Sequence, residues 1–105
     1  MDFDFDETER AFQSAVRRFA LTRVLPESAR WDRGAPVPRG FAASLGELGV
    51  LGLRVPEAFG GSAGTFVLAG IAAEELGRAD MACTLYVQLA LIAGELLAQH
   101  ASPAL

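Results

Sequence analysis

LGELGVLGLRVPEAFGG, at residues 45–61, carries the densest structural information in this sequence. An apolar helical pattern runs into it and meets Gly49, a residue that readily takes the left-handed conformation at which many helices end. The apolar run that follows is too short and too rich in glycine for another helix, and Pro56 keeps the residue before it extended. Glycines 60–61 predict a turn. The stretch therefore predicts a helix, a stop, a buried crossing and a turn into the next helix.

The composition describes a small, acidic and unusually apolar chain. Its 105 residues allow one small domain, 51% of them are hydrophobic, and the net charge is −4. A domain of this size cannot bury so much apolar surface, so we expect a partner, or a further part of the same protein, to cover some of it. The negative charge disfavours nucleic acid and anionic membranes as partners.

The compartment predicted from the sequence is the cytoplasm. The single cysteine, Cys83, excludes an internal disulfide and suits a reducing environment. The N-terminus is acidic where a secretory signal peptide would be basic. The apolar, uncharged stretch at residues 81–94 is shorter than the roughly 20 residues that span a bilayer. We therefore expect a soluble chain that does not enter a membrane.

The spacing of apolar residues predicts a fold made only of α-helices, about five in number. Residues 6–9 have the spacing of a capping box at the start of the first helix. Pro38 suits the first position of the third, and Asp80 can cap the fifth. In the fourth helix the apolar stripe points inward, and Glu74 and Glu75 are expected outside.

Two features of the first helix need interpretation. Pro26 is expected to end it or restart it, because proline cannot continue a helix without disturbing the preceding turn. Arg17 and Arg18 are a possible phosphate contact, but adjacent charges on a helix usually form a solvated face. We expect the solvated face.

The predicted fifth helix, residues 81–98, is apolar on all sides. One stripe is formed by Leu85, Leu89, Ile92 and Leu96, and the other sides hold Tyr86, Val87, Leu91 and Leu97. A helix apolar all round is either central or covered by something else, and four short helices cannot surround it. The pattern therefore predicts a partner outside this sequence.

Residue patterns alone indicate no catalytic, cofactor-binding or metal-ligating residue. The glycine-rich residues 60–65 superficially resemble a phosphate loop, but no lysine follows and no strand precedes them. His100 is the sole histidine and lies 17 positions from Cys83, so the two make neither a metal site nor a catalytic dyad.

Several segments agree with the pattern of one known family. Residues 45–61 follow L-x-E-L-G-(V/L)-L-G-L-x-V-P-E-x-(F/Y)-G-G, and AEELGRAD at 73–80 contains E-E-L-x-R-x-D. VRRFA at 16–20 also agrees. Together these segments resemble the N-terminal helical domain of the acyl-CoA dehydrogenase family. Asp6 departs from the family's frequent threonine at that position, and residues 100–105 depart from the expected (Y/F)-G-(T/S)-E-E-Q turn.

The resemblance implies an all-α, orthogonal helical bundle over residues 1–105, incomplete at its C-terminal end, with the sheet domain and the C-terminal helical domain absent. The family reaction is α,β-desaturation of an acyl thioester, carried by CoA or by a carrier protein. A glutamate removes the α-proton and FAD accepts a hydride from the β-carbon. That glutamate and most FAD contacts belong to the later domains, so this piece alone is expected to be inactive. The complete enzyme is expected to be a homo-oligomer.

The resemblance also places a substrate site on the fifth helix. It aligns Thr84, Gln88 and Ile92 with positions at the far end of the acyl cavity, and Leu91 continues the same side. The alternative is ordinary core packing, with Gln88 hydrogen-bonded inside the bundle.

Two other functions are compatible with the sequence. One is a stand-alone helical interaction module, or a subunit without catalysis of its own. The other is a helix-turn-helix regulator, which the glycine-containing turns allow and the acidic charge disfavours. Flavin absorbance and a DNA-binding assay would distinguish these classes.

Overall fold

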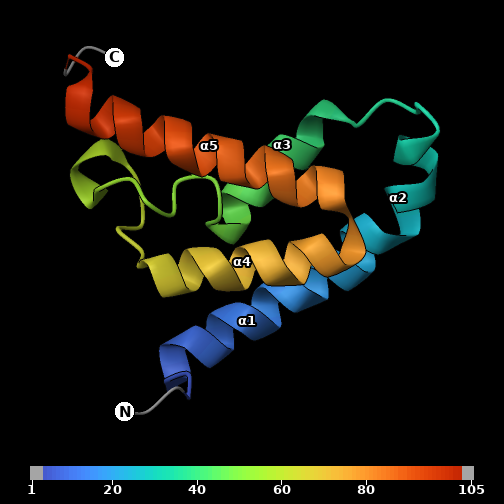
Figure 1. Cartoon of the computed structure of the whole chain (residues 1–105), viewed down its shortest axis with the longest axis horizontal. Coiled ribbons are helices and arrows are strands. Elements are labelled where there is room, and N and C mark those ends of the chain that lie inside the picture. Colours follow the sequence, from blue (N-terminus) through green and yellow to red (C-terminus); the bar gives the residue numbers. More distant parts are fainter. Residues whose placement is uncertain (1–3, 103–105) are drawn as a thin grey trace.

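The computed structural model of the chain describes residues 4–102, and within that range it contains five α-helices and no β-strand (Figure 1). The α-helices are α1 (Glu7–Phe19), α2 (Leu25–Asp32), α3 (Arg39–Leu48), α4 (Phe66–Ala79) and α5 (Met81–His100). A π-helical segment, η1 (Ala20–Val24), joins α1 to α2, and a short 3₁₀ turn, η2 (Glu57–Phe59), precedes α4. The prediction of an all-α bundle is confirmed.

The first helix begins and changes course where its sequence predicts. The Asp6 side chain accepts a hydrogen bond from the Glu9 backbone at 2.8 Å, and Glu9 accepts one from the Asp6 backbone at 2.9 Å, which completes the capping box. Pro26 lies in the first turn of α2. Its ring would collide with the carbonyl four residues earlier in a regular helix, and the wider π-helical turn of η1 precedes it. The helix thus restarts at Pro26.

The segment between α3 and α4, residues 49–65, is called the crossing, and its course is fixed by backbone requirements. Gly49 ends α3 at φ 95°, in the left-handed region, as predicted. Val50 and Leu53 are buried behind it. A Cβ on Gly61 would lie 2.1 Å from the carbonyl oxygen of Val55, so only glycine allows the chain to return this closely. The buried crossing is confirmed.

α5 starts at its predicted cap, and the start of α3 is shifted by one residue from its prediction. Thr65 caps α4 by accepting from the Leu68 backbone at 3.2 Å, and Asp80 caps α5 by accepting from the Ala82 backbone at 2.8 Å. Pro38 precedes the first residue of α3 instead of occupying it, because its ψ of 143° is extended.

α4 and α5 form an antiparallel pair, with α1 along the other side of α4 and α3 behind (Figure 1). The Thr84 hydroxyl donates to the Ala73 carbonyl at 2.8 Å and ties the two helices together near their junction. The molecule measures 40 × 38 × 19 Å. Its short dimension is about two helix diameters, so each helix keeps one face toward solvent.

The core lies between α1, η1, α3, α4, the crossing and one side of α5. Its fully buried large side chains are Val16, Val24, Leu45, Val50, Leu76 and Val87. An aromatic group closes one end: the ring centres of Phe41 and Trp31 are 5.1 Å apart, edge to face, and those of Phe41 and Phe19 are 5.7 Å apart. Trp31 therefore packs α2 onto the bundle.

Candidate functional site

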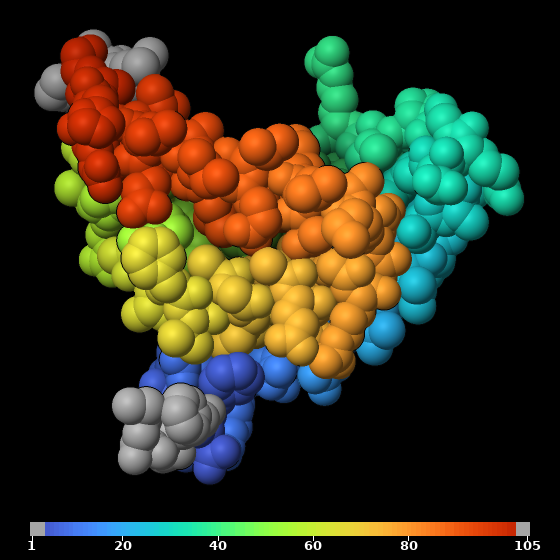
Figure 2. Space-filling view, in the orientation of Figure 1, coloured from blue at the N-terminus to red at the C-terminus, as the bar shows by residue number. Residues whose placement is uncertain are grey.

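α5 has two apolar faces, and the bundle covers one of them. The inner face consists of the buried residues Cys83, Thr84, Val87 and Leu91. The other, which we call the open face, consists of Met81, Leu85, Leu89, Ile92 and Leu96, each between 54% and 68% exposed. In the space-filling view α5 occupies one long edge of the molecule (Figure 2). A row of large apolar residues at helical spacing needs a partner to leave water.

The residues predicted to bind substrate divide between these two faces. Thr84 and Leu91 are buried, and the Thr84 hydroxyl is engaged by the Ala73 carbonyl. Ile92 is 56% exposed on the open face. Gln88 is half-buried and lies at the boundary. The structure thus brings Gln88 and Ile92 to the edge of one surface and holds the other two behind it.

Gln88 is the polar residue of this set with an unmet hydrogen bond. Its Nε2 is buried and has no acceptor among residues 4–102. A buried amide donor without an acceptor costs about 1–3 kcal/mol. The alternative of a Gln88 hydrogen-bonded in the core therefore finds no acceptor for Nε2 within the described part of the chain.

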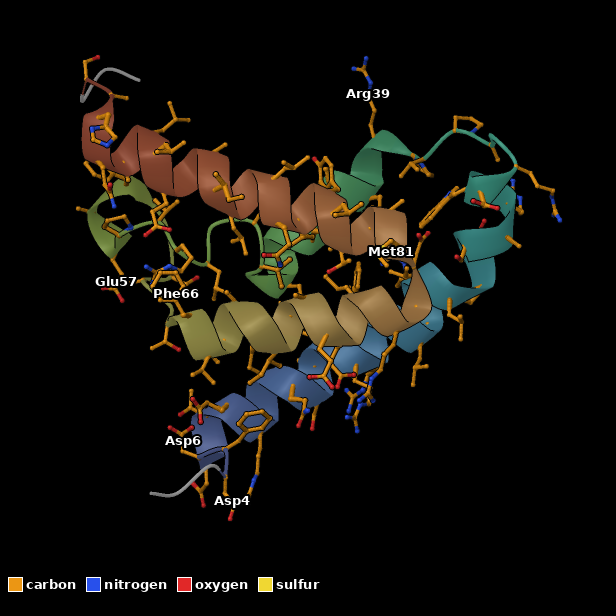
Figure 3. The ribbon with its side chains drawn as sticks, viewed as in Figure 1. Asp4, Asp6, Arg39, Glu57, Phe66 and Met81 are labelled. Carbon is orange, nitrogen blue, oxygen red and sulfur yellow. The ribbon has the colours of Figure 1, made fainter. Side chains whose placement is uncertain are left out.

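An arginine from the crossing fixes the second half of α5. Arg54 donates from Nη2 to Glu95 Oε1 at 2.9 Å and from Nη1 to the Gly64 carbonyl at 2.8 Å. Its guanidinium carbon lies 3.8 Å from the centre of the Phe66 ring, at the start of α4 (Figure 3). The contacts of Arg54 with Glu95, Gly64 and Phe66 were not predicted from the sequence. A charged residue inside an otherwise buried apolar run was the available signal.

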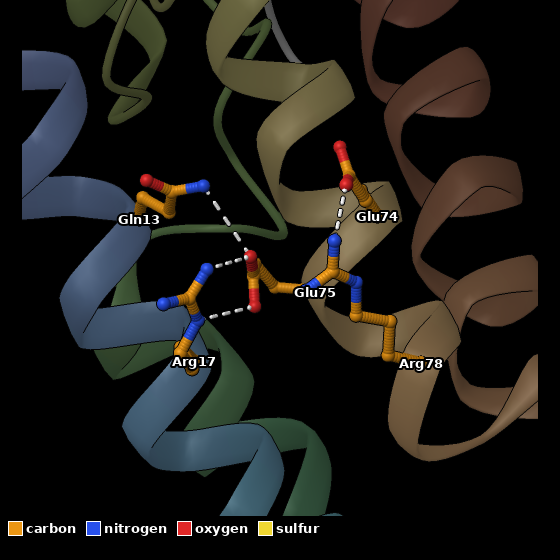
Figure 4. A network of polar contacts seen from close by, with 5 residues as sticks. All are labelled: Gln13, Arg17, Glu74, Glu75 and Arg78. Atoms are coloured by element: carbon orange, nitrogen blue, oxygen red, sulfur yellow. Dashed lines mark hydrogen bonds and ion pairs between the residues drawn. The ribbon is translucent and has the colours of Figure 1, made fainter. Parts of the chain in front are cut away.

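A buried carboxylate joins α1 to α4 (Figure 4). Glu75 Oε2 accepts from Arg17 Nε at 3.0 Å, and Oε1 accepts from Arg17 Nη2 at 2.9 Å and from Gln13 Nε2 at 3.4 Å. The hydrogen bonds from Arg17 lower the pKa of Glu75 against the opposing effect of burial. The same contacts raise the pKa of Arg17.

This network corrects one prediction and adds a contact to another. Glu75 was expected outside α4 and is 3% exposed, while Glu74 is exposed as expected and pairs with Arg78 at 2.8 Å. Arg17 and Arg18 are exposed, as expected, and Arg17 in addition forms a bidentate pair with Glu75. The apolar stripe explains the error, because position 75 follows 68, 71 and 72 at helical spacing and so belongs to the inward side.

A hollow of about 380 Å³ lies beside the first half of α5. Trp31, Phe41, Cys83 and Tyr86 contribute to its walls, and Arg39, at its rim, points away from the body of the domain (Figure 3). Burial raises the pKa of Cys83 to about 11, so its thiol is a packing group and not a nucleophile at neutral pH. Among the described residues no cluster of three or more histidine, cysteine or acidic side chains could hold a metal ion.

α5 is longer than the uncharged stretch from which a membrane span was excluded. It has 20 residues, and its mean hydropathy of 1.7 over the best window suffices for a span by length and composition. Its inner face packs against α4, and Glu95 is paired with Arg54.

Comparison with known proteins gives a consistent result. The family model described as "Acyl-CoA dehydrogenase, N-terminal domain" matches residues 6–105. The chain is 37% identical over 81 residues to benzylmalonyl-CoA dehydrogenase of Aromatoleum aromaticum. The aligned region covers 77% of this chain and 22% of that protein. It is 30% identical to a probable acyl-CoA dehydrogenase of Bacillus subtilis (75% and 21% covered) and 33% identical to the mouse short-chain specific enzyme (72% and 18% covered). The chain therefore spans about a fifth of the length of these relatives.

Proposed function

Because the chain belongs to the acyl-CoA dehydrogenase family through its N-terminal domain, we propose that it is the N-terminal part of a flavin-dependent enzyme that introduces an α,β double bond into an acyl thioester. The observation that carries this proposal is the match of the family model over residues 6–105. The open face of α5 supports it, because an apolar surface of this kind suits a helix beside an acyl group.

We propose that FAD is held by the parts of the enzyme that follow this domain. FAD supplies the hydride acceptor of the family reaction. The hollow beside Trp31 supports this placement, because it is walled mainly by apolar side chains and Arg39 at its rim points away. The domain's own contribution is to bound and orient the acyl group.

Within the domain, we propose that the residues of α5 have two roles, contact with the acyl group and support of the contacting residues. Gln88 and Ile92 contact the far end of the acyl group from the edge of the open face. Thr84 and Leu91 support them from the inner face, where the hydrogen bond from Thr84 to Ala73 fixes the position of α5 on α4.

We expect other protein surfaces to pack on the rest of the open face. Met81, Leu85 and Leu89 are each more than half exposed, and apolar rows of this size are rarely left in water. We propose that later parts of the same enzyme pack on them, that the complete enzyme is a cytoplasmic homo-oligomer, and that its substrate is an acyl-CoA or an acyl-carrier-protein thioester.

The direct test of the reaction uses the complete flavin-loaded enzyme without oxygen. Addition of its acyl-CoA substrate should bleach the flavin absorbance and give one enoyl-CoA for each flavin reduced. A panel of acyl-CoAs and acyl-carrier proteins of different lengths would identify the substrate. If no acyl thioester bleached the flavin, the proposed reaction would be wrong.

The placement of the acyl group is tested by Gln88→Trp in the same enzyme. If Gln88 lies at the far end of the cavity, the indole should shorten it, and kcat/KM for long acyl-CoAs should fall at least about tenfold more than for short ones. Flavin content should stay unchanged. An equal loss of kcat/KM for every chain length would mean that Gln88 is a core-packing residue and does not line the cavity.

A second function is favoured by the same open face. A stand-alone helical module, or a subunit completed by a separate chain, would also present an unpartnered apolar helix. Sedimentation and circular dichroism of the 105-residue chain distinguish the cases. A strictly monomeric chain that melts cooperatively would show that the domain needs no further cover, whereas self-association would show that it does.

A further inference from the structure

Three polar side chains lie along the same side of α5, and two of them have partners. The Thr84 hydroxyl donates to the Ala73 carbonyl at 2.8 Å. Glu95 accepts from Arg54 at 2.9 Å. Gln88, between them, has a buried Nε2 with no acceptor in residues 4–102. Among these three side chains, the unmet donor is therefore at the position that borders the open face, and Arg54 Nε, which belongs to the segment before α4, also has no acceptor in residues 4–102.

An apolar residue of similar shape at position 88 would avoid the cost of an unpaired amide. Glutamine there is favourable if an acceptor reaches it from outside the domain. Leu85 and Ile92, three before and four after it, flank Gln88 on the helix surface, and both are exposed on the open face. A group lying along the open face would pass Gln88, and an outward turn of the side chain would bring Nε2 to it.

The surroundings of Gln88 indicate a neutral acceptor. Arg54, the cation tied to this side of α5, already has its charge paired with Glu95 and its Nη1 bonded to the Gly64 carbonyl, while its Nε has no acceptor in residues 4–102. A carboxylate on the acyl group would therefore be desolvated without a counter-charge, which is costly. A hydroxyl, ether or carbonyl oxygen can accept from a neutral amide without that cost.

We propose, on the basis of the proposed function, that Gln88 makes the enzyme prefer acyl groups that carry a neutral hydrogen-bond acceptor beyond the two carbons that are desaturated. A plain hydrocarbon chain leaves Nε2 unpaired whether the side chain points into the core or out of it. An acyl group with an oxygen at the right depth satisfies Nε2 in the outward position. Gln88 is thus a specificity residue for the polarity of the acyl group as well as for its length.

The test compares two acyl-CoAs of equal length in the complete flavin-loaded enzyme. One is a straight chain, and in the other an ether oxygen replaces one methylene beyond the β-carbon; a series moves the oxygen along the chain. At one depth the ether compound should have a kcat/KM about tenfold higher than the straight chain, the size expected for one satisfied amide donor. Gln88→Leu and Gln88→Met should abolish this preference, mainly through KM.

The matched control is Gln99→Leu, the same change at an exposed position of α5. It should leave the preference intact. The proposal would be overturned if the wild-type enzyme showed no preference at any oxygen position, or if Gln88→Met lowered kcat/KM equally for both compounds, since Gln88 would then bond to a protein group. If no acyl-CoA were oxidised at all, the proposed function would fail and this inference with it. Oxidation without an ether preference would overturn this inference alone.

Discussion

α4 and α5 follow each other in sequence, are both predominantly apolar, and have different surroundings. α4 has α1 on one side and α5 on the other, and its buried Glu75 is paired with Arg17. α5 packs on α4 along its inner face, while Leu89 and its neighbours on the open face remain more than half exposed. The comparison shows that the α1–α4 interface buries and pairs its charged group within this domain, whereas α5 keeps a row of large apolar side chains exposed.

The largest expected effect comes from matched leucines on the two helices. Leu76→Ala on α4 removes a fully buried side chain and should lower the free energy of unfolding by about 3 kcal/mol. Leu89→Ala on α5 removes one that is 67% exposed and should change it by less than about 0.5 kcal/mol in the isolated domain. Chemical denaturation followed by circular dichroism measures both. Equal losses would mean that the open face is buried even without the rest of the enzyme.

A somewhat smaller effect separates the adjacent glutamates of α4. Glu75→Ala leaves Gln13 and Arg17 without their shared acceptor and should cost about 2 kcal/mol. Glu74→Ala removes an exposed i,i+4 pair with Arg78 and should cost less than about 0.5 kcal/mol. The same denaturation experiment applies. A negligible effect of Glu75→Ala would contradict the account of the α1–α4 interface.

These residues show what the sequence could and could not predict. The stop at Gly49 and the cap at Asp80 depend on neighbouring residues, so local chemistry predicted them. Glu75 and Arg17 are 58 positions apart, and Arg54 and Glu95 are 41 apart. Those pairs depend on how helices meet, which periodicity does not describe. A carboxylate at an inward position was still a sign that a cation had to be nearby.

The candidate site was predictable to a similar extent. Helical spacing placed Gln88 and Ile92 on one side of α5, and the structure places both at or beside the open face. Thr84 belongs to the same spacing but bonds to Ala73 of α4. The spacing does not specify the angle at which α5 packs on α4, so it could not separate inner residues from those at the edge.

The smallest expected effect is the pH dependence of the α1–α4 interface. The pKa of Glu75 in the folded chain lies below its ordinary value of 4.5. Its contribution to stability is therefore fully present above about pH 4.5 and is lost as the pH falls through the lowered folded-state pKa. The difference in unfolding free energy between the wild type and Glu75→Gln should be constant near neutral pH and shrink in acid. A difference that grew on acidification would contradict the ion pair.

The contrast between the two helices is tested most directly by the accessibility of the open face in the complete enzyme. Leu89→Cys on α5 and Arg10→Cys on α1 both introduce a thiol at an exposed position of the domain, and the native Cys83 is buried. A thiol reagent should label both at similar rates in the isolated domain. In the complete flavin-loaded enzyme, labelling at position 89 should slow by at least about tenfold relative to position 10, because the proposed function has later parts of the enzyme and the acyl group covering α5. Equal labelling at the two positions in the complete enzyme would contradict the account.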